Sequence, residues 1–165
     1  MMSIGTKHAD VVVVGYGNTL RQDDGFGPIV ADKLRERLKE ARVRIFTRQL
    51  LTVELVADLE FAGLCVLIDA ATTGQAGTLC IRDVTPEHSE PATLGHDLSA
   101  ASLIGLTQRL TGSAPRCILV SAVPEAMELG EGLSDAVAHL VEPAVDGILA
   151  RIAAYFTAAS GCAPT

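Results

Sequence analysis

The feature that most constrains the fold is a run of four valines, Val11–Val14, which ends at Gly15. β-Branched residues favour strands, and a solid apolar run predicts a strand that is buried on both faces. Strands of that kind belong to parallel sheets covered by helices on each side. The sequence therefore predicts an α/β protein with a first strand over 9–14, and the glycine marks the start of the loop that follows.

Alternating and helical patterns predict the remaining elements. Further strands are expected at 43–47, 64–68, 78–84 and 116–123, and helices at 26–40, 53–61, 97–110 and beyond Ser134, the expected cap of the last helix. The loop AATTGQAG before the fourth strand is short enough for a hairpin, so that strand can run antiparallel. The order predicts a single three-layer α/β/α domain over residues 1–165 with a mostly parallel five-stranded sheet, and 1–8 and 158–165 are expected to fray.

Composition and charge narrow the possible functions. The 165 residues are 48% hydrophobic, enough to build a full core, and the net charge of −7 argues against nucleic-acid binding. Cys65, Cys80 and Cys117 lie in apolar runs and no CxxC pair exists, so all three are expected in the core and Cys162 in the tail. No signal peptide and no membrane-spanning run is present, which predicts a soluble cytoplasmic protein.

The loop GYGNTLRQDDGFG at 15–27 is the first candidate site. It fails as a dinucleotide-binding fingerprint because Leu20 occupies the third glycine position of GxGxxG, and no Walker lysine follows. It carries two adjacent carboxylates instead, Asp23 and Asp24. One is enough to cap the helix that follows, which leaves the second to bind a metal ion or another cation.

Two further candidates lie at the ends of predicted elements. Asp69 closes the strand 64–68, and the carboxyl end of a central parallel strand is a favoured place for a ligand or a catalyst, although a turn-forming aspartate is an equally good interpretation. His96 directly precedes the helix at 97–110, where Asp97 is the expected cap and leaves the imidazole free. Neither a GxSxG elbow nor an HExxH motif is present, so a peptidase would need carboxylates, a histidine and a metal.

Four segments in order resemble the [NiFe]-hydrogenase maturation endopeptidases: VVVVGYGNTLRQDDGFG, QLLTVELVADLEFAGLCVLIDA, GHDLSA and VPEAMELGEGLS, followed by a long amphipathic helix. Together they extend from about residue 11 to residue 150, nearly the whole chain. Each segment is weak evidence alone. Their occurrence in this order, in a chain of this length, carries the resemblance.

The resemblance implies that Asp24, Asp69 and His96 are both the metal-contacting and the catalytic residues. The first position is Glu or Asp in the family, and here it is the shorter acid; Gly95 precedes the histidine where Ser, Thr or Pro is expected. Two carboxylates and one imidazole suit nickel or zinc with coordination positions left open. The family's substrate brings its own nickel, so nickel is the one cofactor implied, and the free protein is expected to hold it loosely.

The resemblance therefore predicts an aspartyl or metal-associated endopeptidase, monomeric and cytoplasmic. Its partner would be the nickel-loaded precursor of a [NiFe] hydrogenase large subunit, from which it would remove a short C-terminal peptide. The metal, a carboxylate and His96 all stay open as the group that activates water. The alternative is a non-enzymatic nickel-binding chaperone or sensor of α/β fold, and a nucleotide-dependent enzyme is disfavoured by the failed fingerprint.

Overall fold

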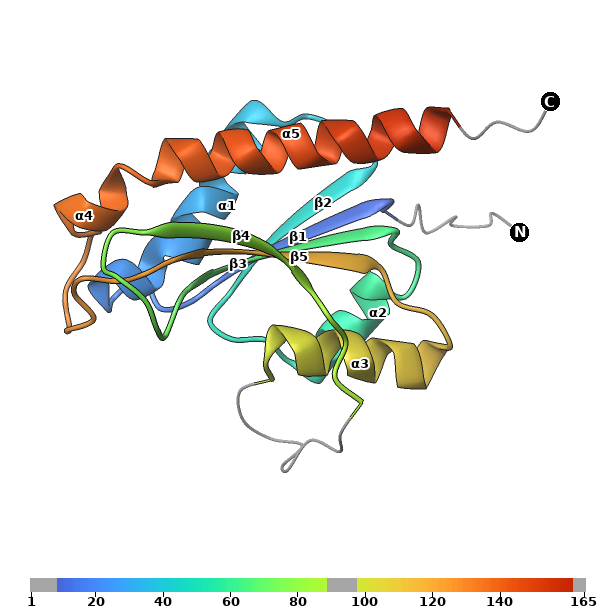
Figure 1. Cartoon of the computed structure of the whole chain (residues 1–165), viewed down its shortest axis with the longest axis horizontal. Helices are drawn as coiled ribbons and strands as arrows, with labels where there is room; N and C mark the ends of the chain where they lie inside the picture. The colour runs from blue at the N-terminus through green and yellow to red at the C-terminus, as the bar shows by residue number, and fades with distance from the viewer. Residues whose placement is uncertain (1–8, 89–97, 162–165) are drawn as a thin grey trace, which may run out of the picture.

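A five-stranded sheet with strand order β2-β1-β3-β5-β4 forms the centre of the protein (Figure 1). The computed structural model describes residues 9–88 and 98–161. β1, β2, β3 and β5 are parallel, and β4 runs antiparallel to β5, which confirms the mostly parallel α/β fold. The strands are β1 (Val11–Tyr16), β2 (Val43–Arg48), β3 (Leu64–Ala70), β4 (Leu79–Val84) and β5 (Arg116–Ala122).

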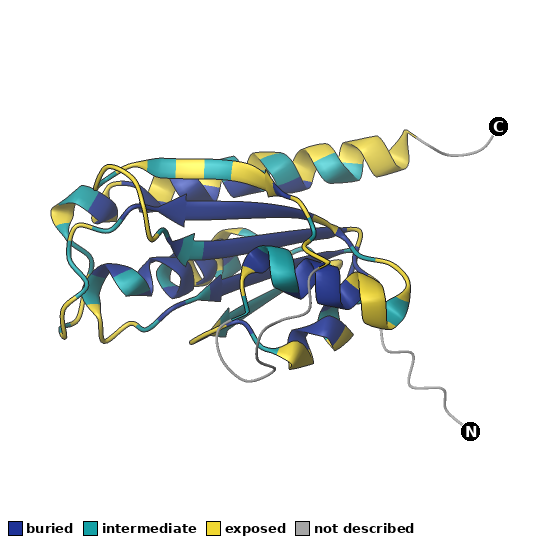
Figure 2. Cartoon of the chain, turned by 60° about the horizontal axis from the view of Figure 1, so that its bottom comes forward, coloured by how far each residue is buried: buried dark blue, intermediate teal, exposed yellow. Residues whose placement is uncertain are grey.

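Helices cover both faces of the sheet (Figure 1). The α-helices are α1 (Phe26–Arg37), α2 (Val56–Leu59), α3 (Ala100–Thr111), α4 (Asp135–Ala138) and α5 (Val141–Ser160), and the short 3₁₀ turns are η1 (Gln22–Gly25) and η2 (Val53–Leu55). Val11 and Val13 pack in one core with α1 and α5, whereas Val12 and Val14 pack in a second core with α2 and α3. All four valines are 0% exposed, as the solid apolar run predicted, and the central strands β1, β3 and β5 are buried along most of their length (Figure 2).

The hairpin predicted between β3 and β4 is wrong, although β4 does run antiparallel. β5 lies between these two strands, and the connection from β3 to β4 crosses its end, where Ala71 N donates to Ala122 O at 2.8 Å. The physical reason is burial. β5 is buried along almost its whole length and takes an interior position, whereas β4 is mostly exposed or half-buried and suits an edge.

The start of α3 also differs from the prediction. The helix begins at Ala100 and is capped by Ser99, whose side chain accepts a hydrogen bond from Ser102 N, so Asp97 is not its cap. A serine at this position satisfies a backbone donor of the first turn as well as an aspartate would. The other end is as predicted: Gly112 adopts a left-handed conformation with φ of 84° and ends the helix.

The long final helix is divided in two. Ser134 precedes α4 but does not cap it, because its hydroxyl donates to Asp23 instead. Pro143 lies in the first turn of α5, where an N–H has no partner within the helix, so a proline is tolerated at this position. α5 then continues to Ser160, beyond the point where fraying was expected. No helix in the described part of the chain is long and apolar enough to cross a membrane.

Two glycines bring the start of α1 close to the sheet. A Cβ atom at Gly15 would lie 2.1 Å from Gly27 O, and one at Gly27 would lie 2.3 Å from Ile68 O. Such distances leave no room for any side chain. The close approach fixes the loop between β1 and α1 over the carboxyl ends of β1 and β3, which is the edge where α/β sheets usually bind ligands.

The cysteines are not part of that edge. Cys65 and Cys117 are buried neighbours on β3 and β5, as predicted for core thiols, and both are free. The hydrogen bond between them and their burial raise the pKa of the Cys65 thiol. Cys80 was expected in the core but is exposed, because the edge strand β4 turns it to solvent.

Candidate active site

Asp69 lies at the carboxyl end of β3, next to Tyr16 at the end of β1. Gly15 pairs with Ile68, so the next residues along the two strands are neighbours on the same face of the sheet. The Tyr16 hydroxyl donates a hydrogen bond to the Asp69 carboxylate, and Ala70 N donates to Oδ1 of Asp69 at 2.7 Å. Donors from two strands therefore hold this carboxylate in place.

The surroundings of Asp69 disfavour its charge. Burial raises the pKa of Asp69 from 3.8 to about 6, although the hydrogen bonds from Tyr16 and Ala70 act in the opposite direction. The negative charge of Asp24 raises this pKa further, so the two carboxylates are near enough to repel each other. Burial and the same Asp69 carboxylate raise the pKa of the Tyr16 hydroxyl well above its ordinary value, so it stays a donor. A cation placed between Asp24 and Asp69 would relieve the repulsion.

Asp24 reaches this position because the loop after β1 folds back on itself. Gly17 has a φ of 138°, and a Cβ atom there would lie 1.9 Å from Asp24 O, so only glycine fits. Asn18 N donates to Oδ2 of Asp24 at 2.9 Å. No hydrogen bond from a described residue reaches Oδ1, which leaves that oxygen available to a ligand.

Asp23, the adjacent acid, has a different role. Its carboxylate is 0% exposed and accepts four hydrogen bonds, from Glu125 N (2.8 Å), Ala126 N (2.9 Å), Ser134 N (2.7 Å) and Ser134 Oγ (2.8 Å). Burial acts to raise the pKa of Asp23, but these hydrogen bonds outweigh it and hold the pKa below its ordinary value. The expectation that one acid of the pair caps α1 is wrong, because no side chain caps that helix. Asp23 joins the first loop to the loop after β5.

Backbone hydrogen bonds extend this connection between the two loops. Gln22 N donates to Gly130 O and Gly130 N donates to Leu20 O, both at 2.9 Å, and together they form a parallel bridge between Arg21 and Gly130. The Arg21 guanidinium adds a hydrogen bond to Met127 O at 3.3 Å. The loop after β5 is therefore part of the same edge as Asp24. Neither this connection nor the role of Tyr16 was predicted from the sequence.

His96, the third predicted ligand, lies outside the described residues. α3 begins shortly after it and packs on the sheet face against which Tyr16 also packs. Within residues 9–88 and 98–161, no group of three or more His, Cys, Asp or Glu side chains could hold a metal ion. The structure brings Asp24 and Asp69 together, but a metal site would need at least one ligand in addition to these two. The metal-binding and catalytic roles of the three residues stay predictions.

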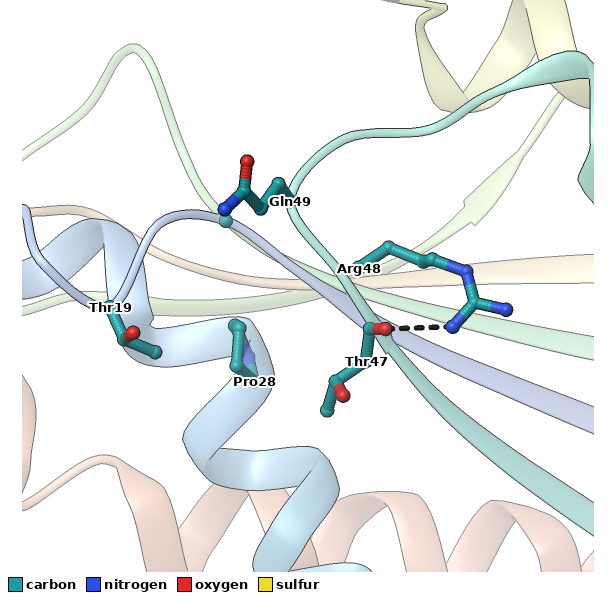
Figure 3. A pocket seen from close by; sticks show the side chains of 6 residues that line it. Thr19, Pro28, Thr47, Arg48 and Gln49 are labelled. Atoms are coloured by element: carbon teal, nitrogen blue, oxygen red, sulfur yellow. Dashed lines mark hydrogen bonds between the residues drawn. The ribbon is translucent and has the colours of Figure 1, made fainter.

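A depression of about 220 Å³ borders the first loop on its β2 side (Figure 3). Neither Asp24 nor Asp69 lines it. Arg48 lies at its rim and donates to Thr47 O at 2.9 Å, shown as the dashed line. The lining residues are Gly17, Thr19, Pro28, Thr47, Arg48 and Gln49. The depression is therefore a neighbour of the carboxylate site and not the site itself.

Known proteins share both the sequence pattern and the fold. The chain is 28% identical over 148 residues to the hydrogenase 2 maturation protease of Escherichia coli K12, a match that covers 86% of this chain and 90% of that protein. No family model matches.

Solved structures agree with this match. The [NiFe] hydrogenase maturation protease HycI from Thermococcus kodakarensis superposes with a TM-score of 0.68 at 27% identity, over 85% of this chain and 90% of that one. The hydrogenase maturating endopeptidase HybD from E. coli superposes with a TM-score of 0.68 at 26% identity, over 88% and 93%. Similarity in sequence and in fold along nearly the whole chain confirms its resemblance to the [NiFe]-hydrogenase maturation endopeptidases, a family of peptidases.

Proposed function

We propose that this protein is a cytoplasmic endopeptidase that removes a short C-terminal peptide from the nickel-loaded precursor of a [NiFe] hydrogenase large subunit. The observation that carries the proposal is the carboxylate pair, Asp24 and Asp69, held at the carboxyl edge of the sheet close enough to interact. The relatives support the reaction class, because they are named as hydrogenase maturation proteases and endopeptidases.

In this proposal the precursor brings the nickel, and Asp24, Asp69 and His96 add ligands to it. The two carboxylates repel each other when no cation is present. The nickel of a loaded precursor would remove this repulsion, so electrostatic attraction would stabilise its complex with the protein and not the complex of an empty precursor. Binding of the metal would thereby give a preference for the nickel-loaded precursor over the nickel-free one. One imidazole and two carboxylates without a thiolate form a weak site for free zinc, so the protein should hold metal loosely by itself.

The alternative, a nickel chaperone or sensor, would use the same ligands but leave the precursor intact. It is not favoured, because the matches in sequence and in structure are to proteases. The mass of the precursor separates the two functions, since only a peptidase shortens it.

The test is to incubate the purified protein, or a His96→Ala variant, with nickel-loaded precursor and to measure the C-terminal mass of the product. His139→Ala is the matched control, because His139 is exposed at the end of α4 and its Nδ1 lies 3.0 Å from Asp135 O, within its own helix region. The wild type and the control should both shorten the precursor, and His96→Ala should not. The unfolding free energy of His96→Ala should change by about 0.5 kcal/mol or less, as for an ordinary surface site.

Two results would contradict the proposal. A precursor that keeps its full mass while its nickel moves to the protein would indicate a chaperone. A His96→Ala variant that loses activity together with a large part of its stability would indicate a structural histidine and not a ligand.

A further inference from the structure

Two leucines lie exposed on the loops that carry the candidate site. Leu129 is 87% exposed, and Leu20 is 52% exposed. The parallel bridge between Arg21 and Gly130 places the preceding residues, Leu20 and Leu129, next to each other. An exposed leucine is common on a protein surface, but two exposed leucines at neighbouring positions of the bridged loops, beside a candidate site, offer apolar surface that suits a protein partner.

The loop that carries Leu129 is held rigidly. Its two ends are fixed by the four hydrogen bonds to Asp23, and its middle by the paired hydrogen bonds of Gly130 with Leu20 and Gln22. A loop free to move could turn its leucine inward, whereas these contacts present the leucine to solvent. A surface fixed in advance loses little conformational entropy when a partner binds.

The same loop is strongly acidic. Between Arg116 and Arg151 the chain has no lysine or arginine, and its acids there are Glu125, Glu128, Glu131, Asp135, Glu142 and Asp146. Arg37 on α1 pairs with the last two of these acids. The three glutamates around Leu129 have no ion pair with any described residue, and Arg21, a basic residue that reaches this loop, donates to the backbone of Met127. The patch is therefore apolar at its centre and negative around it.

We infer that residues 125–131 together with Leu20, here termed the docking loop, bind a segment of the precursor that carries lysine or arginine beside an apolar side chain. This inference rests on the proposed function. The docking loop is anchored by Asp23, the neighbour of Asp24 in the chain, so a segment bound there lies beside the carboxylate pair. Opposite charge would also speed the encounter with the precursor.

The test compares the steady-state processing of nickel-loaded precursor by three variants: Leu129→Ser, the triple Glu125→Gln/Glu128→Gln/Glu131→Gln, and the control Leu110→Ser. Leu110 is a leucine of similar exposure, 63%, near the C-terminal end of α3 and away from the site. Leu129→Ser should raise KM about tenfold and leave kcat within about twofold, as for a binding contact without a role in the reaction. The triple variant should lose most of the salt dependence of KM. The control should match the wild type.

Unchanged KM values in both docking-loop variants, or an equal rise in the control, would overturn the inference while the proposed function stood. If the wild type left the precursor uncut, the proposed function would fail; calorimetric binding of the same precursor to the same variants would still test the docking loop. A wild-type dimer that Leu129→Ser dissociates would assign the patch to a second copy of this chain, which also overturns the inference.

Discussion

The two adjacent acids of the first loop, Asp23 and Asp24, belong to two carboxylate regions that differ in how many hydrogen bonds their oxygens accept. In the anchor region, Asp23 is fully buried and accepts four hydrogen bonds from the loop after β5, and its pKa is lowered. In the carboxylate pair, Asp24 and Asp69 repel each other, and the pKa of Asp69 is raised to about 6. The anchor stabilises the fold, whereas the pair costs stability when both acids are charged. Such a cost is typical of functional sites.

The largest expected effect is on activity. Asp69→Asn or Asp24→Asn should lower kcat/KM for nickel-loaded precursor by about a hundredfold or more, because each removes the charge of a proposed nickel ligand. Neither change should lower the melting temperature substantially, since an amide removes the repulsion between the two acids. Processing at wild-type rates by either variant would show that the pair is not part of the active site.

The next largest effect is on stability. Asp23→Asn should lower the free energy of unfolding by about 2–4 kcal/mol, because an amide nitrogen would face backbone N–H groups and a buried charged acceptor would be lost. Urea unfolding of this variant beside Asp24→Asn measures the difference between adjacent acids. Equal stabilities would contradict the distinction between anchor and pair.

The pH dependence of stability should have opposite signs for the two regions. The pKa of Asp23 is lowered by folding, so its contribution is present above the unfolded pKa near 4 and is lost as the pH falls below it. The pKa of Asp69 is raised from 3.8 to about 6, so it protonates more easily in the folded state. The loss of folding stability caused by the charged Asp69 is absent below pH 3.8. It grows as the pH rises to 6 and reaches about 3 kcal/mol at most.

Urea unfolding at pH 3.5 and pH 7 checks these signs. Relative to the wild type, Asp69→Asn should gain stability at pH 7 and little at pH 3.5. Asp23→Asn should lose more stability at pH 7 than at pH 3.5. If the stability change between pH 3.5 and pH 7 had the same sign in both variants, Asp23 and Asp69 would not differ as the anchor and the carboxylate pair require.

The smallest effect concerns the positioning of Asp69. Tyr16→Phe keeps the ring and removes the hydroxyl that donates to Asp69, so kcat/KM should fall by about tenfold, with a stability change of about 1 kcal/mol. Tyr155→Phe is the matched control, since Tyr155 is half-buried on α5 and packs edge-on against Phe156. An equal loss in both tyrosine variants would assign Tyr16 a packing role only.

What the sequence predicted depends on how local the physical cause is. The valine run specified a strand buried on both faces, and Gly112 marked a helix end, because neighbouring residues decide both features. The hydrogen bonds of Asp23 join residues more than 100 positions apart, so the local sequence around Asp23 and Asp24 did not show which of the two acids would accept buried hydrogen bonds. The partner of β4 was missed for the same reason, since it depends on the burial of β5.

The candidate site was predictable to a different degree. The resemblance pointed to Asp24 and Asp69, and the parallel sheet brings both to one edge. Tyr16 could have been found only by aligning the registers of β1 and β3, which place it beside Asp69.

The most direct test of the central claim is the nickel dependence of cleavage. The protein, stripped of metal by mild chelation, is given the same precursor with and without nickel, and the C-terminal mass is followed with time. We expect full processing of the loaded precursor and none of the empty one, because in the proposed function the carboxylate pair gains a cation only from the substrate. Equal rates of cleavage with and without nickel would contradict it.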